Sequence, residues 1–202
     1  MGIFSKLKQT FSGKSEQTSS VDIAGKFAPE EPQPLDVQFV GQFTAGGGNF
    51  MYCTSEAEAH AVIEHYASEM KLTGLFISSP ELASVKNAVR VPTSFENDGQ
   101  YNAVLSSCEA LIAFNGGIMI HSHHTGGRRL GDLPKNHVII ANTSQIVPNL
   151  RDGMTAINQK YRDNRPSNIS VIRAPHDQAV ELAAADPNKG RTVMLILIED
   201  EV

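Results

Sequence analysis

A chain of 202 residues is long enough for one globular domain, and 41% hydrophobic and 19% charged residues are ordinary proportions for such a domain. The formal net charge is −5 without a basic block beyond a few lysines near the start, which argues against a nucleic-acid-binding surface. The longest apolar runs, such as Val193–Ile198, are far shorter than the roughly 20 residues of a membrane-spanning helix, so we expect a soluble protein.

The cysteine content also limits the possible functions. Cys53 and Cys108 are the two cysteines of the sequence, and its beginning lacks the pattern of a secretory signal. We therefore expect reduced thiols in a cytoplasmic protein. Two thiolates are too few for the four cysteines that usually hold an iron–sulfur cluster, and we predict no cofactor.

Residues 1–34 differ in composition from the rest, and we interpret them as a flexible N-terminal tail before an α/β domain at 35–202. Apolar residues recur at helical spacing in Ile3–Phe11, while Ser12–Pro34 is rich in Ser, Gln, Glu and Pro. The short amphipathic helix is expected to dock on the protein's own core or on a partner rather than on a membrane surface.

The first elements of the domain are predicted from short patterns. Val37–Val40 is a candidate strand, and the glycines at 46–48 indicate a turn or mobile loop. This loop lacks the Lys-Ser/Thr pair of a phosphate-binding P-loop. Ser55 and Glu58 form a capping box, and the apolar face that follows predicts a helix to about Lys71.

Leu75–Ile77 is a compact apolar run after this helix, which is typical of a buried parallel strand and implies a βαβ unit. Pro80–Asn87 is predicted to be a short helix with its proline in the first turn. Asn115-Gly116-Gly117 separates the apolar runs Ala110–Phe114 and Ile118–Ile120, which predicts a tight hairpin because an Asn-Gly pair accepts positive φ at both turn residues.

The remaining elements continue the alternation of strands and helices. The apolar runs Val138–Ala141, Ile169–Ile172 and Val193–Ile198 are predicted strands, the last one buried on both faces. Further expected elements are a helix capped by Asn142 or Thr143 with the apolar stripe Ile146, Leu150, Met154 and Ile157, a helix at His176–Ala185 and a turn at Asp186–Gly190. The pattern predicts a mostly parallel sheet flanked by helices, with one antiparallel hairpin.

The hairpin and the loop that follows it contain the candidate ligand-binding residues. Its second strand leads into a glycine-rich loop with several histidines and two arginines. Guanidinium groups bind carboxylate or phosphate in bidentate fashion, which favours a small anionic ligand, although surface charge or a salt bridge is the alternative. The predicted ligand-binding residues are Asn115, Gly116, Gly117, His121, Arg128 and Arg129.

The histidines also raise the question of a metal. His121, His123 and His124, with His137 nearby, have the imidazoles that zinc or iron prefers. Their spacing repeats no familiar metal motif, so we assign no metal site. Contact with an anion or substrate, and a merely solvated polar loop, are the other two interpretations.

Several short motifs resemble a known family. They span Ser106–Ile172, about a third of the chain, and the acidic end of the final strand, Glu199-Asp200, is also similar. In chain order they are Cys108–Ala113, the turn at Gly116, Gly127-Arg128, Leu133-Pro134, His137–Ile140, Gln145–Pro148 and Pro166–Ile169. Their order and spacing resemble those of the lactate-utilisation (LUD, LutC-type) domain.

This resemblance implies a fold like that of the sugar-phosphate isomerase and CoA-transferase superfamily (NagB/RpiA/CoA-transferase-like). It also implies an accessory role beside iron–sulfur proteins in the oxidation of L-lactate to pyruvate. The chain departs from the family pattern at Phe114, where a carboxylate is usual, and at Asn115, where a hydroxyl is usual. In the family, the stretch Ser-Arg-Thr-Ala-Asp-Ile-Glu often follows the strand that begins with Asn-Ile. This chain has His176–Glu181 in its place.

These departures affect the functional interpretation. A base or metal ligand at position 114 cannot be transferred to this chain, and whether it is an enzyme stays open at this point. The alternatives to the accessory role are a stand-alone enzyme that acts on a sugar phosphate or an acyl-CoA, and an interaction module without catalysis, since fold alone does not fix function.

Overall fold

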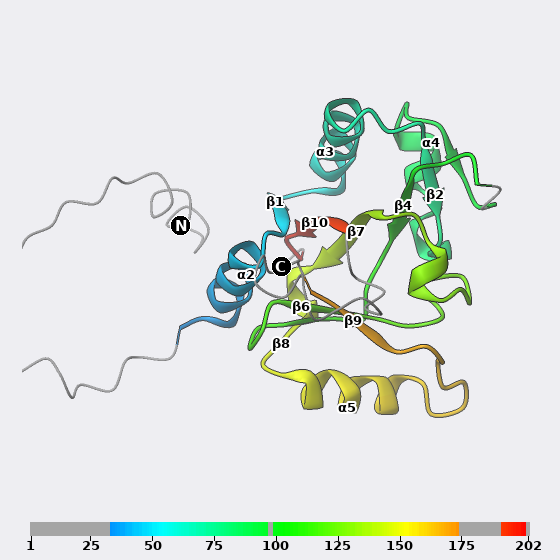
Figure 1. The fold of residues 1–202 in the computed structure, drawn as a ribbon. Coiled ribbons are helices and arrows are strands. Elements are labelled where there is room, and N and C mark those ends of the chain that lie inside the picture. Colours follow the sequence, from blue (N-terminus) through cyan, green and yellow to red (C-terminus); the bar gives the residue numbers. More distant parts are fainter. Residues whose placement is uncertain (1–32, 97–98, 174–190, 201–202) are drawn as a thin grey trace, which may run out of the picture.

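Strands of the computed structural model, which describes residues 33–96, 99–173 and 191–200, form two sheets (Figure 1). The main sheet has six strands, all paired in parallel. Their order is β1 (Asn49–Cys53), β10 (Thr192–Ile198), β7 (Asn136–Asn142), β4 (Ala103–Ser106), β2 (Leu75–Ile77) and β3 (Thr93–Ser94). The predicted α/β class with a mostly parallel sheet is confirmed.

The second sheet has four strands and contains the antiparallel pairs. Its order is β8 (Ile146–Val147), β5 (Ala110–Ile112), β6 (Gly117–Ile120) and β9 (Ser170–Ile172). β5 pairs with β6 and β6 with β9 in antiparallel fashion, whereas β5 and β8 are parallel. The predicted strand at 169–172 therefore exists, but it belongs to this smaller sheet.

Strand β10 joins two hydrophobic cores. Leu195 and Leu197 belong to the core that the two sheets share with α2 (Leu35–Ala45). Met194 and Ile196 point to the opposite face, where they pack with α3 (Glu56–Glu69). Because both faces are covered, the strand can be apolar at every position from 193 to 198, as predicted.

The elements are stacked in layers around the main sheet. In Figure 1, α3 and α4 (Val85–Ala88) lie above the main sheet, and α5 (Leu150–Lys160) lies below the second sheet. Helix α5 packs against the outer face of the second sheet through Ile157, which contacts Ala110, Ile112 and Met119 in a third small core. The second sheet is thus covered on both faces.

One of the two hydrogen bonds of the predicted capping box at the start of α3 is confirmed. The Ser55 hydroxyl accepts a hydrogen bond from the Glu58 main-chain N–H, and the helix begins at Glu56. The Glu58 carboxylate accepts from the main-chain N–H of Thr54, 2.7 Å away, one residue before the expected donor. Both bonds satisfy donors at the start of the helix.

The predicted strand at Val37–Val40 is wrong, because these residues lie inside α2. So short a segment, with three apolar residues and Gln38, does not distinguish a strand from a helix. The buried residues of the segment are Phe39, Val40 and Phe43, which lie on one helical face against the shared core. The glycines that follow form the turn before β1, a strand that the sequence did not indicate.

The helix expected to start at Asn142 or Thr143 begins later, at Leu150, with Asn149 as its N-cap. Asn142 instead caps a 3-10 helix at Thr143–Gln145, and Ile146 lies in β8. The Asn149 side chain accepts from the Asp152 main-chain N–H, 3.1 Å away. A helix start after Pro148 avoids placing a proline inside the helix.

The hairpin between β5 and β6 is confirmed, but its loop has a different form. Ile112 pairs with Gly117, so four residues form the loop instead of a tight two-residue turn. In this loop Gly116 has positive φ, at 64°, and Asn115 does not. A Cβ on Gly116 would lie 2.5 Å from the main-chain nitrogen of Phe43, so the loop packs directly on α2.

Other predicted elements have mixed outcomes. The segment Pro80–Asn87 forms a 3-10 helix at Pro80–Leu82 followed by α4, and a third 3-10 helix covers Leu130–Asp132. The helix at 176–185 and the turn at 186–190 lie outside the described residues, as does most of the predicted tail. The division at residue 34 stays a prediction. None of the helices that the structure describes is long and apolar enough to cross a membrane.

Candidate functional site

Five polar side chains meet at the place where the chain leaves the main sheet and enters the second sheet. Glu109 lies between β4 and β5, and His121 follows β6 directly. His124 lies three residues further on, and Lys160 and Tyr161 come from the end of α5. We call this group the Glu109 cluster, and residues 121–129 the histidine loop.

Glu109 is the acceptor at the centre of the cluster. Its Oε2 accepts hydrogen bonds from His121 Nε2 at 3.0 Å and from the Tyr161 hydroxyl at 2.9 Å. Lys160 Nζ lies 3.3 Å from both carboxylate oxygens. Burial alone would raise the pKa of Glu109, but the hydrogen bonds and the lysine charge outweigh it and lower this pKa to about 2. The carboxylate is ionised at neutral pH and is a poor base.

The histidine loop fixes the orientation of two imidazoles. His121 Nδ1 accepts from the main-chain N–H of His123, and His124 Nδ1 accepts from that of His121, each at 3.3 Å. Each ring therefore carries its proton on Nε2, which faces Glu109. His124 Nε2 lies 3.8 Å from Glu109 Oε2, beyond hydrogen-bond distance. Burial, followed by the charge of His121, lowers the pKa of His124 to about 3.

Serines at the carboxyl ends of β2 and β4 hold the histidine loop against the main sheet. The hydroxyls of Ser78 and Ser79 donate to the main-chain oxygen of His124, at 2.7 and 3.0 Å. Ser79 Oγ also accepts from the Ser107 main-chain N–H, and the Ser107 hydroxyl donates to Glu81. The Glu109 cluster therefore lies beside the carboxyl ends of parallel strands, where α/β proteins usually bind their ligands.

The predicted ligand-binding arginines belong to the same loop. Arg128 is half-buried, with its guanidinium 4.8 Å from the centre of the Phe76 ring, and Arg129 is exposed. Within the described ranges neither guanidinium forms an ion pair. The main-chain N–H groups of the loop that donate to acceptors inside the protein are those of His121, Ser122, His123, His124, Thr125, Gly127 and Arg128. An anion would therefore be bound by the guanidinium groups rather than by a ring of free N–H donors.

The structure separates the hairpin turn from these arginines. Asn115 and Gly116 precede β6, and Gly116 packs against α2, whereas His121 follows the other end of the same strand. Asn115 Oδ1 accepts from the Gly117 main-chain N–H at 3.0 Å, a bond within the turn. The six residues grouped by the sequence thus divide between the two ends of β6, with His121, Arg128 and Arg129 in the histidine loop.

His137 lies apart from the other histidines and forms a second buried group. Arg191 Nη1 lies 3.5 Å from His137 Nδ1, and His137 Nε2 lies 2.7 Å from the Ser106 hydroxyl. Arg191 also donates to the main-chain oxygens of Leu130 and Pro134. All three side chains are buried, which is consistent with a structural role inside the core.

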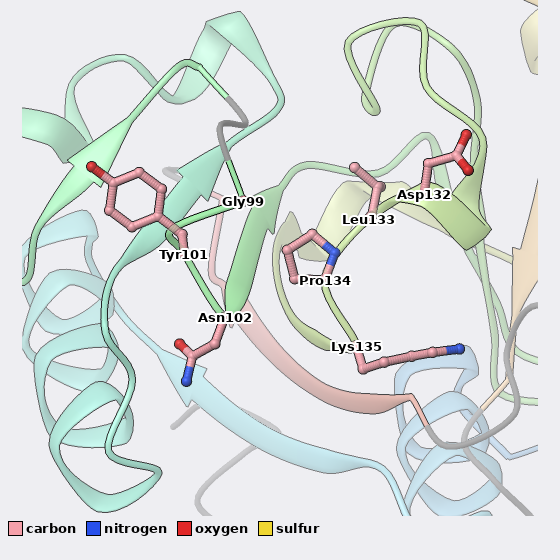
Figure 2. A pocket seen from close by; sticks show the side chains of 7 residues that line it. All are labelled: Gly99, Tyr101, Asn102, Asp132, Leu133, Pro134 and Lys135. Atoms are coloured by element: carbon pink, nitrogen blue, oxygen red, sulfur yellow. The ribbon is translucent and has the colours of Figure 1, made fainter.

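A separate surface cavity of about 450 Å³ lies at the other ends of the main-sheet strands, away from the Glu109 cluster. Figure 2 shows Tyr101 and Asn102 on one wall, just before β4, and Asp132–Lys135 on the other, before β7. Both walls precede strands that are parallel, so the cavity is at their amino ends. Its lining lacks the convergent buried polar groups of the Glu109 cluster, which we therefore take as the stronger candidate site.

The sequence patterns did not identify three members of this cluster, Glu109, Lys160 and Tyr161. Glu109 is one charge inside the otherwise apolar run 108–113, and a buried charge requires partners. Tyr161 lies four residues after Ile157, on the same helical face of α5, so continuation of the predicted stripe would have reached it. The approach of α5 to His121 is a tertiary contact that no local pattern indicates.

Comparisons with known proteins agree on one family. A family model described as the LUD domain matches residues 94–197, more than half of the chain. "Lactate utilization protein C" from Deinococcus radiodurans is 32% identical over 76 residues, which cover 37% of this chain and 36% of that protein. The match thus spans about a third of that relative's length.

One solved structure is also similar. The crystal structure of a DUF162 family protein from Deinococcus radiodurans has a TM-score of 0.59 and 18% sequence identity, over 82% of this chain and 96% of that chain. At this identity the likeness supports the α/β fold and nothing finer. The LUD domain match includes the whole Glu109 cluster and the histidine loop.

Proposed function

Because this chain belongs to the LUD domain family, we propose that it is a cytoplasmic accessory protein of a lactate-utilisation system, working beside iron–sulfur proteins in the oxidation of L-lactate to pyruvate. The observation that carries the proposal is the similarity of 76 residues to a protein named for lactate utilisation. The iron–sulfur partners and the reaction come from the family resemblance. Both cysteines are buried and unpaired, in agreement with a reducing compartment.

The chemistry of Glu109 favours an accessory role over a stand-alone enzyme of the same fold. Such an enzyme needs a carboxylate that is free to act as base or nucleophile. Glu109 accepts bonds from His121, Tyr161 and Lys160, and its pKa is lowered to about 2. Phe114 replaces the other carboxylate that the family usually has, and 71% of this residue is exposed.

A deletion experiment tests the proposed role directly. Removal of the gene from the native cell is expected to prevent growth on L-lactate and to leave growth on pyruvate intact, because only the oxidation step is lost. Affinity purification of the full chain from lactate-grown cells should recover iron–sulfur proteins. Equal growth of the deletion strain and its parent on L-lactate would refute the role.

The small anionic ligand is tested at the histidine loop. Replacing Arg128 and Arg129 together by alanine is expected to weaken binding of lactate or pyruvate by about 1–3 kcal/mol, the range for lost hydrogen bonds to charged groups. Calorimetric titration of lactate, pyruvate, phosphate and CoA into both proteins measures this. Arg151→Ala, an exposed change on α5, is the matched control for loss of positive charge.

Replacing Arg128 and Arg129 together by lysine separates the contribution of charge to ligand binding from that of the guanidinium geometry. It keeps both charges but loses the bidentate contact, so partial rescue would indicate a mainly electrostatic interaction. Unchanged affinity in the alanine variant would remove Arg128 and Arg129 from the site. No binding of any of the four compounds by the unmodified protein would favour an interaction module without a ligand.

A further inference from the structure

Three members of the Glu109 cluster have the chemistry and the spacing of a metal site. Glu109, His121 and His124 each offer one potential ligand atom, and these atoms lie within 4.8 Å of one another. Glu109 Oε2 is 3.0 Å from His121 Nε2 and 3.8 Å from His124 Nε2. Two donors bound to one first-row ion at about 2.0–2.2 Å are separated by roughly 3–3.5 Å in tetrahedral geometry. Small movements would bring the three donors to that separation.

The donor set narrows the class of ion. Two imidazoles and one carboxylate suit first-row divalent ions such as zinc, manganese or iron(II) better than calcium or magnesium, which prefer oxygen. The side chains of His121, His124 and Glu109 are at most 5% exposed, so they are largely shielded from water. Within the described part of the chain, the group contains three protein ligands, which leaves coordination positions open.

We propose that Glu109, His121 and His124 bind a divalent first-row transition-metal ion, and that its open positions accept the carboxylate and the neighbouring oxygen of a 2-hydroxy or 2-oxo acid. The second part rests on the proposed function, because it takes lactate or pyruvate as the ligand. The two oxygens of such an acid form a five-membered chelate with the ion. No redox change of the ion is involved.

The hydrogen bonds around the cluster define what metal binding requires. In the structure His121 Nε2 donates to Glu109, so the ion takes the place of that proton. The proton of each imidazole moves to Nδ1, and the two main-chain contacts at 3.3 Å are lost. Lys160, whose side chain is 60% exposed, can turn away from the carboxylate into solvent. Tyr161 can donate to the second oxygen of Glu109.

The unmodified protein is expected to bind a metal ion even though these hydrogen bonds are lost. The chelator-treated full chain is expected to bind one Co²⁺ per molecule, with the visible absorption bands of a nitrogen- and oxygen-ligated ion. Zn²⁺ and Mn²⁺ are then titrated in competition. Absence of saturable Co²⁺, Zn²⁺ and Mn²⁺ binding by the folded protein would overturn the metal site.

Variants distinguish this ligand set from the histidine group that the sequence suggested. His124→Asn and Glu109→Gln are each expected to weaken Co²⁺ binding at least tenfold. His123→Asn is the matched control, since it removes a neighbouring imidazole outside the proposed set, and its affinity should stay within twofold. Equal losses in the His123 and His124 variants would refute the assignment. Circular dichroism checks the fold of each variant, and if Glu109→Gln does not fold, His124→Asn decides.

Lactate and pyruvate are added last, to the cobalt-loaded protein. A shift of the Co²⁺ bands supports coordination of the acid at the open positions. Unchanged bands at saturating acid would overturn that part of the proposal and leave the ion in place. Growth of the deletion strain on lactate is a separate measurement, so failure of the metal site and failure of the lactate role can be told apart.

Discussion

Lowering the pH from 6.5 to 5 is expected to reduce the free energy of unfolding by about 2 kcal/mol through His137 alone. Burial, with the nearby Arg191 guanidinium, lowers the pKa of His137 to about 3. In the unfolded chain this pKa is about 6.5. On acidification the unfolded state therefore takes up the proton first, and stability is lost progressively between about pH 6.5 and 3.

The groups that face His137 do not offset this loss. Ser106 does not titrate, and burial lowers the pKa of Arg191 only to about 10, so it stays charged over this range. His124 acts in the same direction as His137, because its pKa is also lowered to about 3. The total decrease should thus exceed the contribution of His137.

Denaturant unfolding at several pH values measures this effect. His137→Gln removes the titrating group, and the pH dependence of its stability is expected to be smaller by up to about 1.4 kcal/mol per pH unit. His65→Gln, an exposed change on α3, is the control for the loss of one imidazole. A stability that is constant between pH 6.5 and 5, or an unchanged slope in the His137 variant, would contradict the prediction.

Replacing Gly116 by alanine is expected to destabilise the protein by about 3 kcal/mol, from a strained left-handed backbone and an overpacked contact. Its φ is 64°, and the added Cβ would lie 2.5 Å from the nitrogen and 2.8 Å from the Cα of Phe43. These are main-chain atoms of α2, which cannot move aside as a flexible side chain would. The hairpin or the helix must shift.

Gly127 provides the matched control, because the same substitution adds a Cβ at φ 79° with nothing within 4 Å. Gly127→Ala should therefore lower the free energy of unfolding only through the strained left-handed backbone, by about 1 kcal/mol. Denaturant unfolding of both variants gives the difference, which measures the packing of the hairpin loop on α2. Equal losses would show that α2 does not hold this loop.

The sequence predicted the elements whose patterns are strong and local. The apolar run 193–198 predicted a strand buried on both faces, since six consecutive apolar residues suit β10 between two cores. The Ser55 cap predicted the start of α3 to the residue. The helix at Leu35–Ala45 was missed because its apolar residues at Val37–Val40 form only a short stretch that Gln38 interrupts, and their environment depends on the second sheet.

The candidate site was predicted only in part. His121 was predicted because it lies in a conspicuous loop, but its main partner, Glu109, is twelve residues away and meets it through the antiparallel pairing of β5 and β6. The predicted group also included Asn115–Gly117, since closeness in sequence was taken as closeness in space. Strand β6 runs from Gly117 to Ile120, so Asn115 and Gly116 lie before one end of it and His121 follows the other end.

The place of β10 in the sheet has a consequence for synthesis. β1 pairs only with β10 within the described residues, and β10 also pairs with β7, so β10 is the link between β1 and the other strands. On the ribosome, residues 49–53 emerge long before residues 192–198. Until then the apolar faces of α2 and α3 lack their final neighbours, and a nascent chain that pauses before residue 192 would present them to chaperones.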